Sequence, residues 1–271
     1  MKELIEKVIF LGAVLCGFNT FGQTELLSIG EVHKVQSEIL DEERLLNIYL
    51  PPSYSDTSNF PVVYLLDGSM NEDFLHIVGL MQFFNLQFGM PETIVVGISN
   101  VDRKRDFTFA TNIKSLNKTY PTTGHSNKFI QFLEKELRPF IEDNFKISKT
   151  NYLIGQSLGG LLASEILINK PQMFNHYLIV SPSIWWDDQS LLKQVSSLEV
   201  NKDINAKVFI SVGENEHKVM VKDATRLKEK LVALDRSKLA VDFEIMKGEN
   251  HASILHQSVY SSLLKLFPLK K

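Results

Sequence analysis

Short, uninterrupted apolar runs recur along this chain, and each run ends at a glycine, a serine or a charged residue. Continuous apolar runs are typical of strands buried on both faces of a parallel sheet, whereas half-exposed strands alternate. The runs predict strands at residues 61–66, 93–98, 152–154, 177–180 and 208–212, and the apolar segment 241–246 is expected to form a further strand. Two earlier segments, 31–40 and 44–50, flank an acidic turn at 41–43 and are expected to pair as an antiparallel edge.

Between these strands, apolar residues at spacings of three and four predict helices. They cover residues 129–141, where Pro139 is expected to kink or divide the helix, and also 161–168, 221–234 and 253–267. Residues 99–127 show no clear period and are expected to form a long loop near the carboxyl edge of the sheet.

The alternation of strand and helix predicts an α/β fold of the α/β-hydrolase type, with a mostly parallel sheet covered by helices on both faces. No large insertion separates residues 180 and 206, so no large lid is expected. The 271 residues contain no internal repeat or low-complexity linker, and residues 23–271 are predicted to form a single domain. A net charge of −3 gives no reason to expect nucleic acid or an anionic membrane surface as a partner.

The N-terminus has the pattern of a signal peptide. Two lysines precede the apolar run 8–18, which is shorter than the about 20 residues that span a bilayer. Small residues favour cleavage between Gly22 and Gln23, which predicts a periplasmic or secreted protein whose mature chain inserts in no membrane. Acidic residues in the first turn leave a buried first helix as the alternative. The only cysteine, Cys16, lies inside this segment, so the mature chain would hold no disulfide.

The stretch GQSLG at residues 155–159 lies between the strand 152–154 and a helix. A serine hydroxyl is a poor nucleophile unless a base reaches it, so it must project from the backbone. A sharp strand-to-helix turn achieves this, and the flanking glycines leave room for it. The motif therefore predicts that Ser157 is a nucleophile.

On this architecture the acid follows the seventh strand and the histidine follows the eighth. His251 comes directly after the last predicted strand and is expected to be the base, whereas His256 falls within the helix that follows. The spacing G-x-x-acid-x-x-V favours Glu216 as the acid that orients the imidazole. Glu214 is the second candidate, and a serine–histidine pair without a dedicated acid is the third.

An oxyanion hole requires two N–H donors. The amide of Leu158 follows the nucleophile, and the second donor is expected from Gly68 in the turn LLDG at residues 65–68. A simple loop glycine is the alternative for Gly68. No H-E-x-x-H or comparable ligand spacing occurs in the sequence, so neither a metal nor a cofactor is predicted.

Six motifs occur in order, namely LLDG at 65–68, RDFT at 105–108, GQSLGG at 155–160, SPSIWWDD at 181–188, SVGENE at 211–216 and GENH at 248–251. With them, the sequence between about residues 35 and 267 resembles the "putative esterase" branch of the α/β-hydrolases. This branch includes siderophore esterases, feruloyl and acetylxylan esterases, and S-formylglutathione hydrolase. SPSIWW together with RDFT looks most like the siderophore-esterase subgroup.

The resemblance implies Ser157 as nucleophile and His251 as base, with Arg105 and Trp185 beside the substrate. The chain departs from the family pattern where Phe109 follows RDFT in place of a frequent proline, and where the acid is Glu rather than Asp. Some siderophore esterases work as serine–histidine dyads.

The residues themselves leave the substrate contacts open. Arg103 and Arg105 offer planar donors to an anionic or catecholate ligand, or they pair with neighbouring aspartates. Of Trp185 and Trp186, one is expected to close off core and the other to form an aromatic wall.

The leading hypothesis is an exported serine carboxyl-ester hydrolase that forms an acyl-enzyme and acts on a small-molecule ester, such as a siderophore trilactone or a related aryl or acyl ester. Acyl transfer and hydrolysis of feruloyl or acetyl-carbohydrate esters are the alternatives on the same fold. The third class is a non-catalytic binding module.

Overall fold

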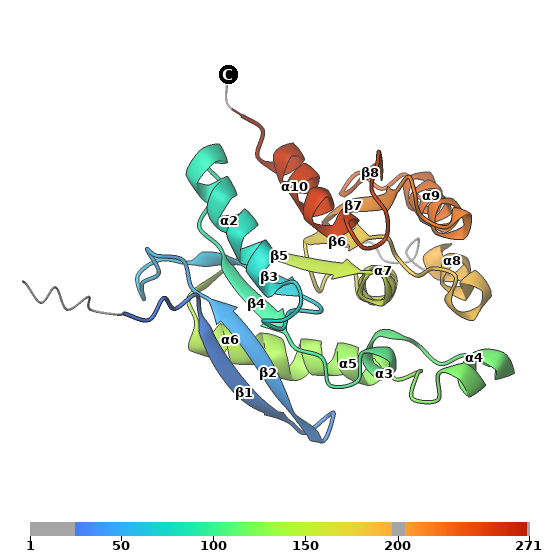
Figure 1. Ribbon diagram of the computed structural model, residues 1–271, viewed down its shortest axis with the longest axis horizontal. Coiled ribbons are helices and arrows are strands. Elements are labelled where there is room, and N and C mark those ends of the chain that lie inside the picture. The colour runs from blue at the N-terminus through green and yellow to red at the C-terminus, as the bar shows by residue number, and fades with distance from the viewer. Residues whose placement is uncertain (1–24, 197–203, 270–271) are drawn as a thin grey trace, which may run out of the picture.

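The computed structural model describes residues 25–196 and 204–269 (Figure 1). Within these residues eight strands form one sheet in the order β1-β2-β4-β3-β5-β6-β7-β8. The strands are β1 (Glu31–Ser37), β2 (Glu42–Tyr49), β3 (Phe60–Leu65), β4 (Ile94–Ile98), β5 (Ile147–Gln156), β6 (His176–Val180), β7 (Ala206–Gly213) and β8 (Leu239–Met246). Strands β3 to β8 are parallel, and only β1 and β2 pair antiparallel with their neighbours. The predicted α/β-hydrolase fold is confirmed, while the proposed signal peptide at 1–22 lies outside the described residues.

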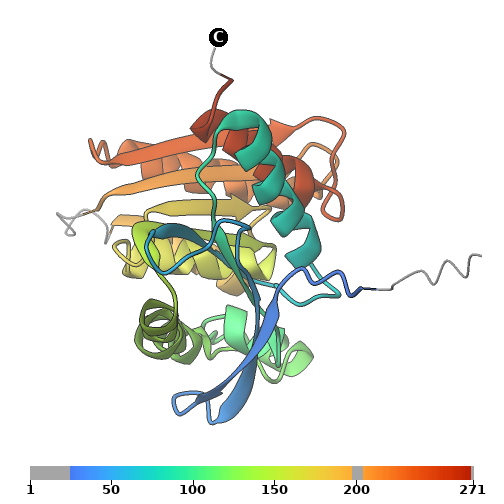
Figure 2. The same cartoon turned by 90° about the vertical axis from the view of Figure 1, so that its left-hand side faces the viewer.

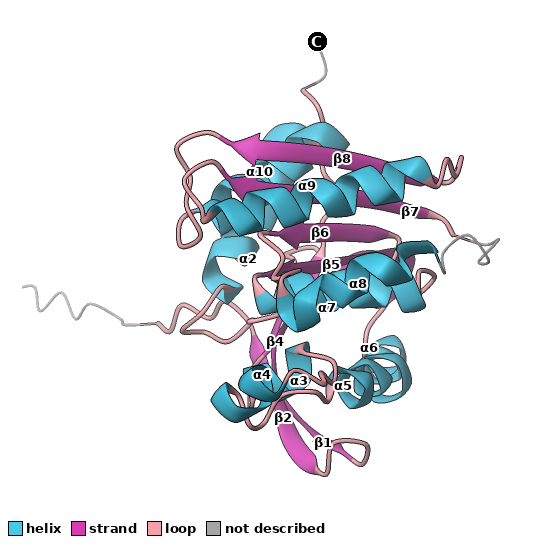
Figure 3. Cartoon of the chain, turned by 90° about the vertical axis from the view of Figure 1, so that its right-hand side faces the viewer, coloured by secondary structure: helices cyan, strands magenta, loops and turns pink. Residues whose placement is uncertain are grey.

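Helices cover both faces of the sheet (Figures 1 and 3). They are α2 (Phe74–Phe88), α3 (Arg103–Phe107), α4 (Lys114–Thr119), α5 (Ser126–Phe132), α6 (Arg138–Asn144), α7 (Leu158–Asn169), α8 (Ser190–Gln194), α9 (Lys218–Ala233) and α10 (Ile254–Leu266). One apolar cluster packs α2 and α10 against one face of the sheet. A second cluster packs helices α5, α6, α7, α8 and α9 against the other face. Strands β3, β4, β6 and β7 are therefore buried along most of their length, which is why their apolar runs are continuous. The edge strand β8 contains Asp242 and Glu244 and is partly exposed.

The predicted N-terminal hairpin is present as β1 and β2, at the end of the sheet opposite β8 (Figure 2). Its turn covers residues 38–41 rather than 41–43, because β1 ends at Ser37 and β2 already begins at Glu42. The carboxylate of Glu42 pairs with Arg44 of the same strand and with Arg105 of the 99–127 segment, and the second contact holds the start of β2 against that segment.

Two segments differ from the sequence expectation. The expected loop 99–127 contains two short helices, α3 and α4, which hold five and six residues and are too short to create an apolar period. The side chain of Asp102 starts α3 by accepting a hydrogen bond of 3.0 Å from the Arg105 amide. The sequence did not predict helix α2, because its own apolar residues are spread around the helix and do not form one stripe.

Pro139 divides the predicted helix 129–141, as expected. A wider π-helical turn, η1 (Leu133–Leu137), separates α5 from α6, and the amide of Arg138 bonds to the Leu133 carbonyl five residues back. Proline has no N–H to continue the ordinary ladder, which fits a register change just before it.

The described part of the β6–β7 connection consists of a 3-10 turn, η2 (Trp186–Gln189), and α8. Trp186, Leu191 and Leu192 of these elements are buried in the core, so this stretch packs onto the domain. Among residues 25–196 and 204–269, no helix combines the length and apolar character needed to cross a bilayer.

Candidate active site

The carboxyl ends of β5, β6, β7 and β8 lie next to one another because these strands are parallel and adjacent in the sheet. Ser157 follows β5, Glu216 follows β7, and His251 follows β8. The order of the chain and the order of the strands therefore bring the three candidate residues to one edge of the sheet, as expected for ligand sites in open α/β sheets.

Ser157 occupies a strained turn between β5 and α7. Its backbone angles, φ of 59° and ψ of −116°, lie outside the regions that residues other than glycine ordinarily adopt. A Cβ atom at Gly155 would approach the carbonyl oxygen of Gly159 to 2.4 Å, so only glycine permits the start of α7 to fold back over β5. A Cβ atom at Gly159 would meet its neighbours at 3.4 Å or more, which is ordinary contact. The tight position is thus Gly155.

His251 and Glu216 form a hydrogen-bonded pair. Nδ1 of His251 lies 2.7 Å from Oε2 of Glu216 and must donate, because an ionised carboxylate only accepts. The side chain of Glu216 is 1 % exposed and that of His251 is 45 % exposed. The buried carboxylate therefore fixes the orientation of the exposed imidazole, and Nε2 is the ring nitrogen that can accept a proton.

The second oxygen of Glu216 accepts hydrogen bonds from the Gly213 amide, at 2.8 Å, and from the Ser181 hydroxyl. Burial by itself raises the pKa of this carboxyl, but the hydrogen bonds from His251, Ser181 and Gly213 outweigh burial and lower the pKa below its ordinary value. Glu216 is thus held ionised. The carboxylate of Glu214 instead accepts a hydrogen bond from the Gly248 amide at 3.1 Å.

The Ser157 hydroxyl lies 3.3 Å from the hydroxyl of Ser183. In the part of the chain that the structure describes, no hydrogen bond joins it to His251. Such contacts are often long in free enzymes and tighten when substrate binds. The loop that carries His251 is connected to the serine turn by another contact, since the side-chain Nε2 of Gln156 donates to the His251 carbonyl at 2.5 Å.

The two expected oxyanion donors differ in availability. The amide of Leu158 is in the first turn of α7 and has no acceptor in the described residues. The amide of Gly68 donates to the Ile98 carbonyl at 3.0 Å and is therefore already used. A Cβ at Gly68 would lie 2.4 Å from Cα of Gly97, so this glycine serves the close approach of two backbones. The next amide in the same turn belongs to Ser69 and donates to the carboxylate of Glu72 at 3.3 Å.

A cavity of about 200 Å³ opens beside the candidate nucleophile. It is lined by Arg103, Lys104, Thr108, Tyr120, Thr123, Ser157, Leu158, Ser183, Trp185 and Trp186. Trp185 is partly exposed to the cavity, whereas Trp186 is 1 % exposed and donates its indole N–H to the Phe109 carbonyl at 2.9 Å. One tryptophan thus closes the core and the other forms a wall, as the sequence predicted.

The two arginines of the 99–127 segment have different positions. Arg103 lines the cavity and forms an ion pair with Asp67. Arg105, the residue expected beside the substrate, pairs with Glu42 and Asp106 and is not among the lining residues. Arg103 and Arg105 are two residues apart in α3, so their side chains leave the helix on opposite sides. Arg105 points toward the buried carboxylate of Asp106.

Sequence reasoning did not single out Lys104, Tyr120 or Ser183. The ammonium of Lys104 lies 5.0 Å from the centre of the Tyr120 ring, which is a cation–π contact at the cavity wall. Ser183 belongs to the SPSIWW motif, so its neighbourhood was recognised from the sequence although its contact with Ser157 was not.

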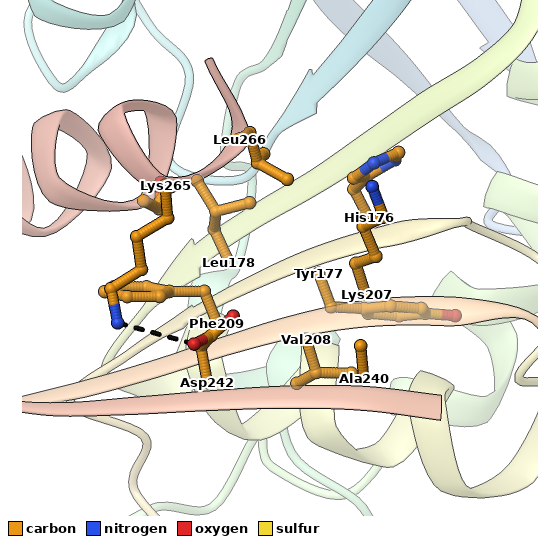
Figure 4. Close-up of a pocket in the computed structure, with 11 residues that line it drawn as sticks. His176, Tyr177, Leu178, Lys207, Val208, Phe209, Ala240, Asp242, Lys265 and Leu266 are labelled. Carbon is orange, nitrogen blue, oxygen red and sulfur yellow. Dashed lines mark hydrogen bonds and ion pairs between the residues drawn. The ribbon is translucent and has the colours of Figure 1, made fainter. Parts of the chain in front are cut away.

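A second cavity, of about 210 Å³, lies at the amino ends of β6, β7 and β8, beside the last turn of α10 (Figure 4). Lys265 and Asp242 pair across its rim, and His176 and Lys207 stand at the other end. None of the candidate catalytic residues lines it, because they follow the opposite ends of the same strands.

A mostly parallel eight-stranded sheet with a strained serine after β5 and a paired acid and histidine after β7 and β8 defines the α/β-hydrolase class. Residues 37–259 match the family model described as "Putative esterase". The chain belongs to this family of ester hydrolases.

Similar proteins agree with this membership. The ferri-bacillibactin esterase BesA of Bacillus subtilis (strain 168) is 30 % identical over 243 residues, which cover 79 % of this chain and 82 % of BesA. The crystal structure of the BES protein from Bacillus cereus is 31 % identical, with a TM-score of 0.80, and the match covers 94 % of this chain and 100 % of that one. An IroE-like serine hydrolase from Shewanella oneidensis is 31 % identical, with a TM-score of 0.79 and coverage of 88 % and 80 %.

Proposed function

We propose that the protein is an exported serine esterase that hydrolyses a siderophore ester or a related aryl ester through an acyl-enzyme. The observation that carries the proposal is the 2.7 Å hydrogen bond from His251 to the buried Glu216, at the sheet edge where the strained turn presents Ser157. A buried, ionised acid that orients an exposed imidazole has little structural purpose other than to prepare a base. The serine-hydrolase description of the Shewanella oneidensis relative supports the same mechanism.

In this mechanism Ser157 Oγ attacks the ester carbonyl and gives its proton to Nε2 of His251. Glu216 holds the imidazole in the required tautomer and stabilises the imidazolium that forms. The Leu158 amide donates to the oxyanion. The Ser69 amide is the proposed second donor, because its partner is the Glu72 side chain at 3.3 Å, which an oxyanion would replace, whereas the Gly68 amide is bonded to the backbone of β4. The protonated His251 then releases the alcohol, and water cleaves the acyl-enzyme by the same route.

The cavity lining supports an anionic aryl substrate. Arg103 and Lys104 supply positive charge, and Trp185 and Tyr120 supply aromatic surface within one cavity beside Ser157. A catecholate ester of a siderophore combines both features. The name of the Bacillus subtilis relative, a ferri-bacillibactin esterase, supports this substrate class.

The test compares the purified full chain with Ser157→Ala, His251→Ala and the matched control His256→Ala, which removes an exposed imidazole of α10. Substrates are short-chain p-nitrophenyl esters, a feruloyl ester and a ferric tricatecholate trilactone. We expect the first two variants to lose at least about 1,000-fold in kcat, the control to keep its activity, and the trilactone to have the highest kcat/KM. Activity that persists without Ser157 would refute the mechanism, and a preference for the feruloyl ester would move the substrate class.

Export is tested separately. Residues 1–22, fused to a periplasmic reporter enzyme, are expected to direct it out of the cytoplasm. The mass of the exported protein is expected to correspond to a chain that begins at Gln23. An unprocessed chain retained in the cytoplasm would contradict this part of the proposal.

A further inference from the structure

The turn after β6 places two serines against the candidate catalytic residues. The hydroxyl of Ser181 donates to Glu216, and the hydroxyl of Ser183 lies 3.3 Å from that of Ser157. The amide of Ser183 also donates to the Ser157 carbonyl at 3.0 Å. The amide and the hydroxyl of Ser183 therefore both contact Ser157, and at 3 % exposure water has little access to Ser183.

The fold holds this turn close to the nucleophile. A Cβ atom at Gly160 would lie 2.9 Å from the Val180 carbonyl oxygen and 3.0 Å from Cα of Pro182, so glycine is required for the turn to rest on the first turn of α7. The φ of Ser181 is 43°, a conformation that the surrounding contacts impose. The position of Ser183 is thus set by the backbone before any substrate binds.

The donor in the hydrogen bond between Ser183 and Ser157 follows from the other partners of the two hydroxyls. Ser183 Oγ has no acceptor other than Ser157 Oγ among the described side chains and carbonyls. When Ser157 gives its proton to Nε2 of His251, Ser157 Oγ retains only acceptor capacity, and Ser183 is the neighbouring hydroxyl that donates to it. A hydrogen bond to a charged oxygen is about twice as strong as one to a neutral hydroxyl.

We propose that Ser183 is a further catalytic residue, which donates a hydrogen bond to Ser157 Oγ while negative charge develops there during acylation. The inference rests on the proposed function. In the step, the bond from Ser157 Oγ to the carbonyl carbon forms and the proton of Ser157 passes to His251. The ester C–O bond then breaks and the leaving oxygen takes that proton. Ser183 keeps its own proton throughout. Its hydrogen bond is stronger in the transition state than in the ground state because Ser157 Oγ carries more negative charge while its proton passes to His251.

The experiment measures acylation directly in the full chain, as the burst rate with a p-nitrophenyl ester and as the inactivation rate with an uncharged fluorophosphonate. Ser183→Ala is expected to lower both rates about 10-fold or more, with the half-saturating ester concentration unchanged. Ser183→Thr, which keeps the hydroxyl, is expected to recover part of the rate. The control Ser190→Ala removes a buried hydroxyl of α8 that has no partner among the described residues, and it should leave both rates unchanged.

The outcomes separate the two proposals. If the fluorophosphonate labels Ser157 and Ser183→Ala reacts as fast as the wild type, the role of Ser183 is refuted and the esterase mechanism stands. If Ser183→Ala loses rate only in proportion to a lowered melting temperature, and Ser183→Thr recovers nothing, the residue is structural. If Ser157→Ala retains the burst, both proposals fall.

Discussion

The guanidinium of Arg103 grips the carboxylate of Asp67 through two hydrogen bonds, from Nε to Oδ1 at 2.6 Å and from Nη2 to Oδ2 at 2.8 Å. Nη2 also donates to the Gln156 carbonyl at 3.2 Å, directly before Ser157. Arg103 thus ties the turn after β3 to the serine turn while its side chain lines the cavity. One residue is placed to support the site and to meet an anionic substrate.

Arg103→Lys is expected to lose the two-pronged contact, because an ammonium cannot match the fork of a guanidinium. We expect about 1–2 kcal/mol less free energy of unfolding in urea and a higher KM for an anionic aryl ester than for a neutral one. Arg105→Lys is the matched variant, since Arg105 pairs with Glu42 and Asp106 outside the cavity. A larger rise in KM for Arg105→Lys would support the position that the family resemblance implies.

Glu216→Gln is expected to reduce kcat roughly 1,000-fold or more, because the amide no longer favours the required tautomer and charge of His251. Glu214→Gln is expected to keep the wild-type kcat, since Glu214 binds the Gly248 amide instead. Steady-state kinetics with a p-nitrophenyl ester measures both. If Glu216→Gln keeps kcat within about 10-fold, the site works as a serine–histidine dyad.

Three glycine-to-alanine variants test the crowding around the nucleophile. Gly155→Ala is expected to cost more than about 3 kcal/mol of unfolding free energy, because its Cβ would overlap backbone that cannot move without breaking the turn. Gly160→Ala is expected to displace the turn that carries Ser183, so that the activation free energy derived from kcat changes more than the free energy of unfolding. Gly79→Ala in α2 meets no atom within 4 Å and is expected to gain up to about 1 kcal/mol. Equal behaviour of the three variants would contradict the crowding argument.

Glu165 of α7 predicts a pH dependence of stability. Burial raises the pKa of this carboxyl from 4.5 to about 7, and the nearby Ser126 hydroxyl opposes the rise only in part. The residue is 7 % exposed, and Oε2 has no partner among the described residues. Since the folded state binds the proton more tightly, Glu165 reduces stability as pH rises from 4.5 to 7, by roughly 3 kcal/mol in total.

Glu165→Gln is therefore expected to be more stable than the wild type at pH 8, with the difference vanishing near pH 4.5. Urea denaturation at several pH values measures this difference. A difference that is independent of pH between 4.5 and 8 would show that folding does not raise the pKa of Glu165.

The hydrophobic pattern and motif order determined much of the result. Continuous apolar runs located the parallel strands β3 to β7, because strands covered on both faces have no polar side. The edge strand β8 was located from a segment in which apolar residues alternate with Asp242 and Glu244. The chain order of Ser157, Glu216 and His251 placed them at one sheet edge, since parallel strands present their carboxyl ends together. Helix α2 escaped this reasoning because an apolar surface on all sides leaves no period to read.

Side-chain direction within the turns was decided only by the tertiary structure. Glu214 and Glu216 are two residues apart, and their roles separate because one meets the backbone of Gly248 and the other meets His251. The Gly68 amide donates to the carbonyl of Ile98 on β4, a contact that its local sequence does not reveal. Local sequence specifies that a turn exists and which chemistry it carries. Contacts with residues about 30 positions or more along the chain specify where each group points.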